Sequence, residues 1–513
     1  MAVTTSIQRS AKNIGANILI SAGPTLAQIG PLRRRVVGRY EKQILSGLEK
    51  ARSDPDTLPG IAEDKAAMGL AILASIERGL VENRVSKATL RAAIKVLAQT
   101  LLLKERDLSI EERFKAEHGW RAPSFLLVSP SKACNLRCTG CYADSGKTTE
   151  KLDWDTVDRL ITEAKTLWGA HLFAISGGEP FAYRSGRKGV LDIVEKHSDC
   201  IFLTYTNGTL ITPEISRRLA QAGNMLLAIS VEGWKERTDT RRGEGVFDRV
   251  LETMKLLRQE GAPFGISLTA TRENAEEILS DEFIDFFMEQ GALFGWIFQY
   301  MPIGRSYTLD LMPTPEQRVW MWRRSWEIVR KKRMFLADFW NSGTACDGCL
   351  SAGGHGAGGY FYVDWNGTVS PCVFFPYSPI NIKDVYGHGR NLNDVWGEPF
   401  FRAVRQWQLD YKLKGGNGLA PCPLRDHHTE MRRIILQHEP NPSDENAAAA
   451  LLDPDYARGL AAYDEALEQL TGHIWETRYM RRNASGADGF EPLPDIPKPQ
   501  EATVTEPEDA AAR

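Results

Sequence analysis

Cysteine is scarce in this sequence, with eight residues among 513, which is far too few for a small disulfide-stapled scaffold. A charge of one sign is also missing, because 63 lysines and arginines stand against 66 acidic residues and leave a net charge of -3. No whole-chain field therefore favours nucleic acid, and no nucleic-acid partner is expected. The chain has no run of 18 apolar residues, and we expect no secretory signal. These absences predict a cytoplasmic, multidomain protein whose function resides in local sites.

The first 118 residues are predicted to form a helical domain, with apolar residues at helical spacing in segments 40–48, 66–80 and 90–103. Residues 1–40 contain six basic residues and no acidic one. This pattern has two interpretations, a solvated basic arm or a surface that lies on anionic lipid or an anionic substrate. The second interpretation adds peripheral contact with the inner membrane face to the cytoplasmic location.

From residue 124 onward, short apolar runs alternate with helical segments, a pattern typical of parallel strands joined by crossover helices. Six strand-helix units predict an α/β fold, a partial (β/α)6 TIM-like barrel over residues 119–305, with ligands at the C-terminal ends of the strands. The expected strands are 125–129, 172–176, 201–206, 225–231, 264–270 and 294–301. The expected helices are 154–167, 190–197, 213–222, 247–259 and 281–290.

Beyond the barrel, a helix is expected at 315–331, followed by a cysteine-bearing segment, 346–422, with few regular signals. We interpret that segment as a separate, metal-organised module within a domain that spans 306–435. A C-terminal helix is expected within 436–482. The acidic, proline-containing tail, 483–513, has almost no core-forming side chains and is predicted to be disordered.

The strongest chemical signal is Cys134-Asn-Leu-Arg-Cys138-Thr-Gly-Cys141, a C-x3-C-x2-C array directly after the first expected strand. Three thiolates in one tight loop suit an iron-sulfur cluster, whereas a zinc or four-cysteine site needs a fourth ligand nearby. The next cysteine along the chain, Cys200, falls in an expected strand and is interpreted as a buried core thiol. Three ligands leave one iron open, where a small molecule can bind and react.

This loop resembles that of the radical S-adenosylmethionine (SAM) superfamily, in which the open iron chelates SAM. The segment after the second expected strand, Ser176-Gly177-Gly178-Glu179-Pro180, looks like the GGEP motif of that superfamily, which binds the amino group of the methionine part. Glycines allow the backbone to approach a ligand closely, and a carboxylate suits an ammonium group. The resemblance implies a 4Fe-4S cluster on the three cysteines, with SAM as cofactor.

Polar residues also follow the third and fourth expected strands, at the same rim of the sheet. These residues are Asn207, Ser230 and Glu232, and by resemblance they would contact the ribose and methionine portions of SAM. Arg242, or its neighbour Arg241, would pair with the SAM carboxylate, because a guanidinium fork matches a carboxylate. For each position the alternative is a turn or helix cap without ligand contact.

Four cysteines remain, namely Cys346, Cys349, Cys372 and Cys422, the number that saturates one further iron-sulfur cluster or one zinc. Before the third of them, segment 361–369 is predicted to form a hairpin with an Asn-Gly turn. A hairpin followed by a cysteine resembles the SPASM or twitch extension of radical SAM enzymes, and four cysteines favour the twitch-like form. The resemblance implies an auxiliary 4Fe-4S cluster, with structural zinc and unligated thiols as the alternatives.

The sixth expected strand ends in residues that are predicted to face the radical. Gln299, Tyr300 and Arg305 are the candidates for substrate contact. The alternative is that they merely cap the barrel.

The resemblance implies reductive cleavage of SAM to a 5'-deoxyadenosyl radical, which abstracts hydrogen from an unactivated carbon, with a flavodoxin- or ferredoxin-type reductant as partner. The region after residue 300 looks similar to class D radical SAM methyltransferases and tetraether lipid synthases. That similarity implies carbon-carbon bond formation or alkylation on a lipid chain or another small molecule. One alternative is a SPASM-type maturase of a precursor peptide, against which the helical N-terminal segment argues. The other is a non-catalytic iron-sulfur protein of electron transfer or regulation.

Overall fold

A ten-stranded sheet forms the centre of the computed structural model, which describes residues 25, 27–102, 104–354, 358–480, 492–496 and 498–499. The strands follow the order β13-β11-β10-β1-β2-β5-β6-β7-β8-β9. Neighbours from β10 to β9 are parallel, and β11 and β13 add an antiparallel edge. These strands are β1 (Phe125–Val128), β2 (Leu172–Ile175), β5 (Ile201–Thr206), β6 (Met225–Val231), β7 (Phe264–Ala270), β8 (Phe294–Gln299), β9 (Phe335–Asp338), β10 (Tyr360–Val363), β11 (Thr368–Ser370) and β13 (Ile380–Asn381).

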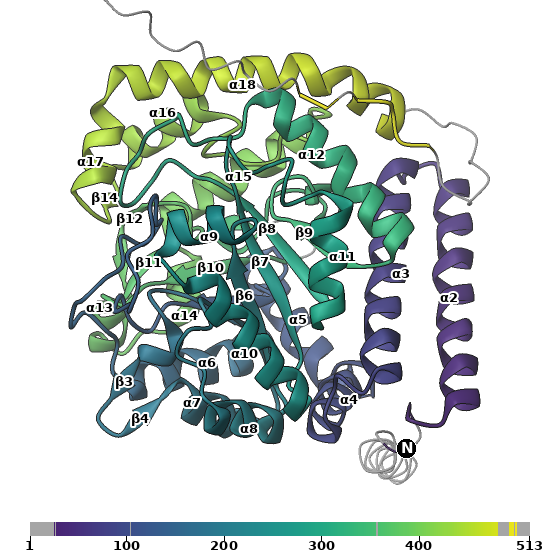
Figure 1. The fold of residues 1–513 in the computed structure, drawn as a ribbon. Helices are drawn as coiled ribbons and strands as arrows, with labels where there is room; N and C mark the ends of the chain where they lie inside the picture. The colour runs from purple at the N-terminus through teal and green to yellow at the C-terminus, as the bar shows by residue number, and fades with distance from the viewer. Residues whose placement is uncertain are drawn as a thin grey trace, which may run out of the picture.

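Crossover helices cover the outer face of the sheet (Figure 1). They are α6 (Trp154–Trp168), α7 (Val190–Lys196), α8 (Pro213–Ala222), α9 (Lys235–Arg242), α10 (Val246–Glu260), α11 (Asp281–Gln290) and α12 (Pro315–Glu327), the last continued by a π-helical segment, η2 (Ile328–Lys332). A short η1 turn (Pro180–Ala182) and the β3–β4 hairpin (Arg184–Ser185 and Lys188–Gly189) lie between β2 and α7. The α/β fold and its six predicted strand-helix units are confirmed, and β5, β6, β7, α8 and α11 have the predicted bounds.

Caps explain where several of these helices begin. The Asp153 carboxylate accepts from the Thr156 amide, 2.7 Å away, at the start of α6, and Ser280 plays the same part for α11. At α12, Thr314 and Gln317 form a reciprocal capping box. Each cap satisfies amides at a helix start that would otherwise lack partners, so the sequence fixes these boundaries locally.

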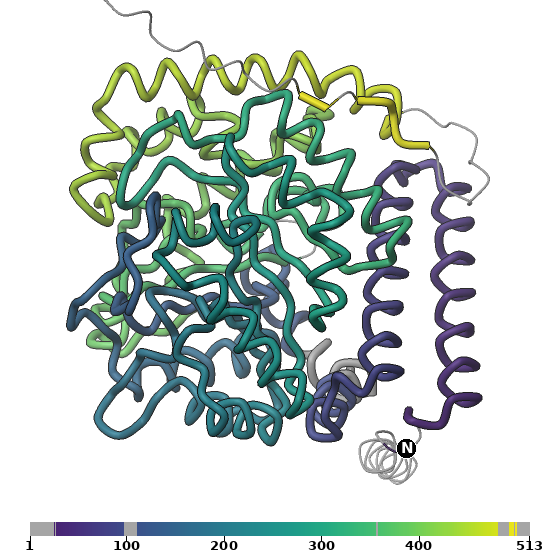
Figure 2. The backbone as a smooth tube through the Cα atoms, in the orientation of Figure 1, coloured from purple at the N-terminus to yellow at the C-terminus, as the bar shows by residue number. Residues whose placement is uncertain are grey.

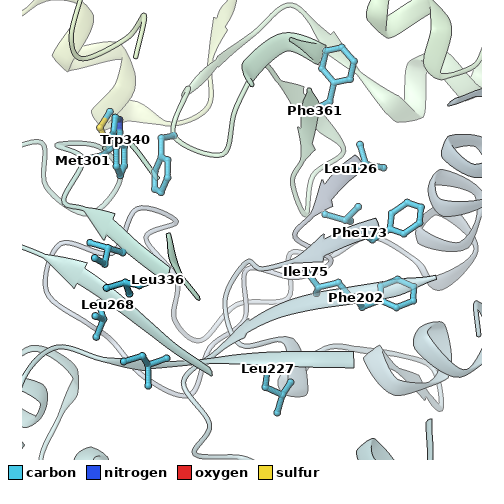
Figure 3. Packing of buried hydrophobic residues seen from close by; sticks show 14 of the residues in the cluster. Leu126, Phe173, Ile175, Phe202, Leu227, Leu268, Met301, Leu336, Trp340 and Phe361 are labelled. Carbon is cyan, nitrogen blue, oxygen red and sulfur yellow. The ribbon is translucent and has the colours of Figure 1, made fainter. Parts of the chain in front are cut away.

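Side chains alternate between the two faces of the sheet. Leu126, Leu227 and Leu268 belong to the main core that the crossover helices share. On the opposite face, Leu127, the chain neighbour of Leu126, pairs with Ala174 of β2, and both line an internal cavity. Figure 3 shows that the strands do not lie in one plane but curve around, and side chains of the inner face line the cavity.

The sheet does not end at the sixth predicted strand. Strand β9 pairs in parallel with β8, and β10 pairs in parallel with β1. We interpreted segment 346–422 as a separate module, and this was wrong in one respect, because its strand β10 continues the barrel sheet. Pairing between strands so far apart in the chain leaves no local trace in the sequence. The predicted hairpin is confirmed as β10 and β11.

This C-terminal region is also more helical than we predicted. The shorter turns are η3 (Gly343–Cys346) and η4 (Ser351–Gly353), and the small strands are β12 (Tyr377–Ser378) and β14 (Asn441–Pro442). The helices are α13 (Ile382–Gly387), α14 (Leu392–Trp396), α15 (Pro399–Leu413), α16 (His428–His438), α17 (Glu445–Leu452) and α18 (Pro454–Ile474), which a π-helical segment, η5 (Trp475–Met480), continues. The signal for α15 was present, since Pro399 opens it and Phe400, Phe401 and Val404 are buried at helical spacing.

Four N-terminal helices lie beside the barrel: α2 (Gly30–Ser53), α3 (Pro59–Val81), α4 (Lys87–Leu102) and α5 (Lys104–His118). Helix α3 meets the C-terminal end of the chain, where α18 crosses above α12 and η5 descends to α3 (Figure 2). There the buried Asp64 carboxylate accepts hydrogen bonds of 2.7 Å from both the Thr344 and the Tyr479 hydroxyls. Helix α3, η3 and η5 are thus joined through one side chain.

No helix among the described residues is long and apolar enough to cross a bilayer. Of the tail that we predicted to be disordered, only residues 492–496 and 498–499 are described, so most of that prediction lies outside the described residues. The same holds for most of the acid-free segment, of which residue 25 and residues 27–40 are described.

A buried ion pair connects α12 to the loop that carries Cys422. The Nη2 atom of Arg318 donates to Oδ2 of Asp426 at 2.8 Å, and the same oxygen accepts from the Cys422 amide at 3.1 Å. Burial alone would raise the pKa of Asp426, but the Arg318 and Arg425 guanidiniums hold it well below its usual value. The pair therefore fixes a cysteine as well as a helix.

Replacement of this carboxylate should destabilise the fold strongly. Asp426→Ala is expected to lower the free energy of unfolding by about 3–5 kcal/mol, because it leaves Arg318 buried without its partner. Urea unfolding at neutral pH measures the effect. Because the folded-state pKa of Asp426 is lowered, its contribution is present above the unfolded value of about 3.9 and is lost as the pH falls further.

The exposed pair of Glu430 and Arg433, 3.4 Å apart on α16, provides the matched control. Glu430→Ala should change the free energy of unfolding by less than about 1 kcal/mol. Equal losses in the two variants would contradict the role that we assign to the buried pair.

Candidate active site

The three cysteines of the C-x3-C-x2-C array lie on the loop after β1 and line one cavity at the C-terminal ends of the strands. Backbone hydrogen bonds hold this loop, since the Cys134 amide donates to the Gly146 carbonyl at 2.9 Å and the Asp144 amide to the Cys141 carbonyl at 3.0 Å. Burial raises the pKa of the Cys134 thiol to about 11. Without metal this thiol is therefore protonated at neutral pH, and a bound metal would displace the proton.

The turn after β2 packs directly against the cysteine loop. The Gly178 amide donates to the Ser131 carbonyl and the Glu179 amide to the Ala133 carbonyl, each at 2.9 Å. A Cβ atom at Gly178 would lie 2.1 Å from the Ala133 oxygen. A Cβ atom at Gly177, whose φ is 116°, would lie 2.6 Å from the Ser131 oxygen. Only glycine fits at both positions, so turn and loop form one backbone cradle.

Glu179 is not among the residues that line this cavity, and its predicted contact with the amino group of SAM stays a prediction. Its Oε1 accepts from the Phe181 amide at 3.0 Å and the Thr206 hydroxyl at 2.7 Å, and its Oε2 accepts from the Asn207 amide at 2.8 Å. Burial raises the pKa of Glu179, while these donors oppose the rise. Because protein donors already hold the carboxylate, its place in the structure is to join the ends of β2 and β5.

Six of the eight predicted cofactor-binding residues do line the cavity: Ser176, Gly177, Gly178, Asn207, Ser230 and Arg242. The Asn207 amide group donates to the Asn135 side chain at 3.0 Å and lies 3.8 Å from the Cys134 sulfur. The Ser176 hydroxyl shares a 2.7 Å hydrogen bond with the Tyr142 hydroxyl. The structure thus gathers these groups around the cysteines, and their contact with SAM stays a prediction.

Glu232, the other exception, is buried beneath two arginines. Its Oε1 lies 2.7 Å from Arg241 Nη1 and accepts a 2.8 Å hydrogen bond from Arg242 Nε, while its Oε2 accepts from the Thr269 amide at 3.1 Å. Burial lowers the pKa of Arg242, but the Glu232 carboxylate more than offsets this and raises it above its usual value. Arg242 therefore remains a cation, with Nη1 3.9 Å from the Cys138 sulfur.

Arg305 is not among the residues that line this cavity, and its predicted contact with substrate stays a prediction. Its Nε donates to Asp144 at 2.8 Å, its Nη1 to the Cys138 carbonyl at 2.6 Å, and its Nη2 to the Ser145 carbonyl. The guanidinium is thus occupied by the cysteine loop from three sides. Its part in the structure is to clamp that loop to the end of β8.

The other two predicted substrate residues, Gln299 and Tyr300, line the cavity. The Tyr300 hydroxyl donates to the Ser306 carbonyl at 2.8 Å, so its ring edge is what remains for a ligand. The Gln299 Nε2 lies 3.1 Å from both carboxylate oxygens of Asp338, whereas its buried Oε1 has no hydrogen-bond partner. Among the residues that line the cavity, Gln299 thus has a buried acceptor without a partner, as does the Ser145 hydroxyl.

The second cysteine group comes from three places in the chain. Cys346 ends η3 and Cys349 follows it, Cys372 follows β11, and Cys422 precedes α16. All four line the same cavity as the first group. The Cys372 sulfur accepts from the Phe374 amide at 3.4 Å, and the Cys349 sulfur from the Ser351 amide at 3.5 Å. Amide donors of this kind stabilise sulfur ligands of iron-sulfur clusters.

The spacing of the sulfurs tests which metal would fit. In neither cysteine group do three ligand atoms all lie within 4.8 Å of one another, and all eight cysteines are among the described residues. Zinc–sulfur bonds of about 2.3 Å would bring the sulfurs of a tetrahedral zinc site closer than that. The wider spacing suits polynuclear iron-sulfur clusters, which are held by several thiolates.

One cavity of about 480 Å³ connects the two cysteine groups. Its walls are rich in aromatic rings, among them Phe298, Phe339, Trp340 and Phe374. These rings contact one another at centroid distances of 5.1 to 5.8 Å, so they form a firm apolar lining. Such a lining excludes water, as a site that handles carbon radicals requires.

Cys200 is buried, as predicted, although it precedes β5 instead of lying within the strand. Its sulfur lies near Asp199 and His171 at the starts of β2 and β5. The Lys165 ammonium binds the Asp199 carboxylate at 2.7 Å, so a cation already occupies the acidic member of this group. Cys200 does not line the cavity and takes no part in the site.

Three thiols on a loop after the first strand of an open parallel barrel, cradled by a glycine turn, define the class of enzymes that bind SAM at an iron-sulfur cluster. The comparisons agree with this class. A model of the radical SAM superfamily matches residues 128–282. The chain belongs to the radical SAM superfamily and is an enzyme that uses SAM and a 4Fe-4S cluster.

Several curated relatives match more than half of this chain, among them a heme synthase and a maturase. The AdoMet-dependent heme synthase of Methanosarcina barkeri is 28% identical over 58% of this chain and 88% of that protein. The mycofactocin maturase MftC of Mycolicibacterium smegmatis is 30% identical over 57% of this chain and 75% of that protein. Among solved structures, Streptococcus suis SuiB bound to precursor peptide SuiA is similar with a TM-score of 0.48 and 18% identity, over 60% of this chain and 72% of that chain.

Several site residues escaped the sequence analysis. Asn135 lies inside the cysteine motif, and Asp338 and Asp426 lie in segments where we identified no polar motif. Asp338 lies on β9, an edge strand that we did not predict. Asp426 gains its role through an ion pair with an arginine that is distant in the sequence. The one signal in the sequence that could have identified Asp426 was its position four residues after Cys422, a predicted metal ligand.

Loss of single cysteines should separate the two groups. Cys138→Ala is expected to abolish 5'-deoxyadenosine formation, because it removes one of three ligands. Cys372→Ala should keep SAM cleavage while lowering iron content by roughly half. Anaerobic reconstitution followed by iron, sulfide and 5'-deoxyadenosine assays measures both effects.

Cys200→Ser is the control for these two variants, because this thiol is buried away from the cavity. It should retain the iron content and SAM cleavage of the wild-type enzyme. A loss of iron in this variant would show that our division of the cysteines is wrong.

Proposed function

We propose that this enzyme modifies a precursor peptide by radical chemistry and holds an auxiliary iron-sulfur cluster on Cys346, Cys349, Cys372 and Cys422. The relative MftC, named a maturase, supports this, because its similarity covers 57% of this chain and 75% of that protein. A flavodoxin- or ferredoxin-type protein is the proposed reductant. The lipid substrate that we favoured from the sequence gains no support from the relatives named above.

The size of the cavity favours a substrate of which only a small part enters the cavity. At about 480 Å³ it lies within the range of about 300–1,000 Å³ typical of small-molecule sites. SAM is itself a ligand of this size, and together with the clusters on the cavity's cysteines it would fill much of the space. One side chain of a peptide fits the remainder, while the rest of the peptide stays outside.

The single observation that carries the proposal is the unsatisfied acceptor at Gln299. Two backbone amides, of Trp340 and Asn341, and the Asn341 side chain donate to the Asp338 carboxylate, at 2.9 to 3.0 Å. Burial raises the pKa of Asp338, while these donors oppose the rise. In its ionised form Asp338 accepts hydrogen bonds, so it turns the Gln299 NH2 group toward itself and the Gln299 oxygen away. A buried oxygen without a partner is costly, and a peptide N–H would satisfy it.

Residues of the chain itself would hold the cluster, place a positive charge beside it and keep water from the radical. A 4Fe-4S cluster with SAM supplies, when bound, the electron that cleaves SAM and the carbon radical that abstracts hydrogen. Cys134, Cys138 and Cys141 would hold this cluster, and Arg242 places a positive charge beside Cys138. The aromatic lining keeps water from the radical, and Arg305 keeps the cysteine loop in place.

A second candidate substrate is a tetrapyrrole. The AdoMet-dependent heme synthase is the relative that suggests it, and the aromatic rings that line the cavity would suit the face of a flat macrocycle. The limited space beside SAM argues for the peptide. The two candidates differ in a property that can be measured, since only a tetrapyrrole should bind with a change in visible absorbance.

Reduced, anaerobically reconstituted enzyme should form 5'-deoxyadenosine from SAM, and a peptide encoded beside this chain should raise the rate and change in mass. Mass spectrometry of the peptide, with an iron porphyrin tested in parallel, measures the outcome. A mass change in the porphyrin with an unchanged peptide would replace the proposal by the tetrapyrrole alternative.

Gln299→Leu should lower peptide turnover by roughly tenfold, because it removes a hydrogen bond worth about 1 kcal/mol or slightly more. SAM cleavage without peptide should continue at the wild-type rate. The matched control is Gln406→Leu, which removes a glutamine that donates to Asp410 at 2.7 Å on the exposed side of α15. Equal turnover in Gln299→Leu and the control would contradict peptide recognition by this oxygen.

A further inference from the structure

Helix α2 presents a stripe of large apolar side chains to the outside of the molecule. Leu32, Val36 and Tyr40 repeat every four residues and are 37%, 45% and 49% exposed, and Ile29, just before the helix, is 47% exposed. This spacing places them on one side of the helix. Single exposed apolar residues need no explanation, but an ordered row of them does.

Helix α3 extends this apolar surface. A Cβ atom at Gly69 would lie 3.5 Å from Ile44 of α2, which fixes the register of the two antiparallel helices. Counted from this contact, Ile76 lies level with Val37, the neighbour of Val36, and Ile72 lies one turn away. Ile72 and Ile76 are 39% and 52% exposed.

The two apolar rows face the same side of the helix pair. Successive residues of a helix are rotated by roughly 100° about its axis. Measured from the line along which the two helices touch, the apolar row of each helix is therefore rotated in the same sense and by a similar angle. In an antiparallel pair, two such rows point in the same direction. We call this surface the hairpin face; it consists of Ile29, Leu32, Val36, Tyr40, Ile72 and Ile76.

Positive charge borders the hairpin face. Arg35, Arg39 and Lys42 are exposed on the flank of α2 beside the apolar row. No acidic residue precedes Glu41 in the chain, although the whole chain has a net charge of -3. Apolar residues flanked by arginine and lysine are typical of a helix that lies in a membrane interface.

The shape of the surface favours a bilayer over a peptide. Helix α2 lies at the edge of the molecule and packs against α3 (Figure 1). Neither cavity described in the structure is lined by a residue of α2, whereas a helical or extended peptide needs a groove or a sheet edge. A convex row of apolar side chains with basic neighbours matches a flat surface of anionic headgroups.

We propose that the α2–α3 hairpin docks the enzyme on an anionic lipid bilayer, with the hairpin face at the headgroup boundary and Arg35 and Arg39 against lipid phosphates. This proposal does not depend on the proposed peptide substrate. It assigns to the N-terminal helices a part that the radical chemistry leaves open.

Sedimentation of the full chain with vesicles tests the docking. Binding to phosphatidylcholine vesicles that contain phosphatidylglycerol is expected at low salt, with at least roughly tenfold weaker binding to phosphatidylcholine alone or at high salt. Leu32→Ser with Val36→Ser, and Arg35→Glu with Arg39→Glu, should each weaken the binding by a similar factor. Both double variants should keep SAM cleavage, which shows that they are folded.

The matched controls lie on α15, far from α2 in the sequence. Leu413→Ser removes an apolar side chain that is 75% exposed, and Lys412→Glu with Lys414→Glu reverses two exposed charges. Both should bind vesicles as the wild type does. Unchanged binding by the two α2 variants, or no binding by the wild type, would overturn the proposal.

Analytical ultracentrifugation separates the remaining occupants of the hairpin face. A wild-type dimer that Leu32→Ser with Val36→Ser converts to a monomer, without vesicle binding by either, would make the face a contact between two copies. Peptide turnover lost in these variants, with no vesicle binding by the wild type, would make it a peptide surface. Either result overturns docking on lipid and leaves the SAM chemistry unaffected.

Discussion

The site depends on how closely two loops at the strand ends approach each other. Gly177 and Gly178 allow the turn after β2 to lie against the carbonyls of the cysteine loop, where a Cβ atom would be only 2.1 to 2.6 Å from oxygen. Every larger residue would push the loop outward and spread the three thiols. The backbone therefore sets the positions of the metal-binding thiols. Glu179 and Arg305 stabilise this arrangement through hydrogen bonds to neighbouring loops.

The motifs that carry local chemistry could be predicted, and the partners of polar side chains could not. The cysteine array and glycine turn are short and lie at strand ends. Strands β5, β6 and β7 matched their predicted bounds, and the apolar runs of β6 and β7 are buried on both faces. Glu179 was placed at SAM by its resemblance to the GGEP motif, and Arg305 at the substrate by its position after the sixth expected strand. The sequence shows no protein partner for either residue. In the structure each is satisfied by protein groups that come from other loops.

The extension of the sheet was not predicted for the same reason, because it depends on partners that lie far apart in the sequence. Strand β10 pairs with β1, more than 200 positions earlier in the chain, and no local pattern announces such pairing. Its consequence is functional, because β9, β10 and β11 bring Asp338 and Cys372 to the cavity that also holds the first three cysteines. The two cysteine groups therefore share one aromatic chamber, where a substrate placed between them meets both.

The central claim is that Cys134, Cys138 and Cys141 leave one iron free for SAM, while the auxiliary cysteines form a cluster without this property. Electron paramagnetic resonance of the reduced, reconstituted enzyme with and without SAM tests it most directly. The account predicts two overlapping cluster signals, of which one shifts when SAM is added and is missing in Cys138→Ala. A spectrum that SAM leaves unchanged, in enzyme loaded with both clusters, would contradict the account.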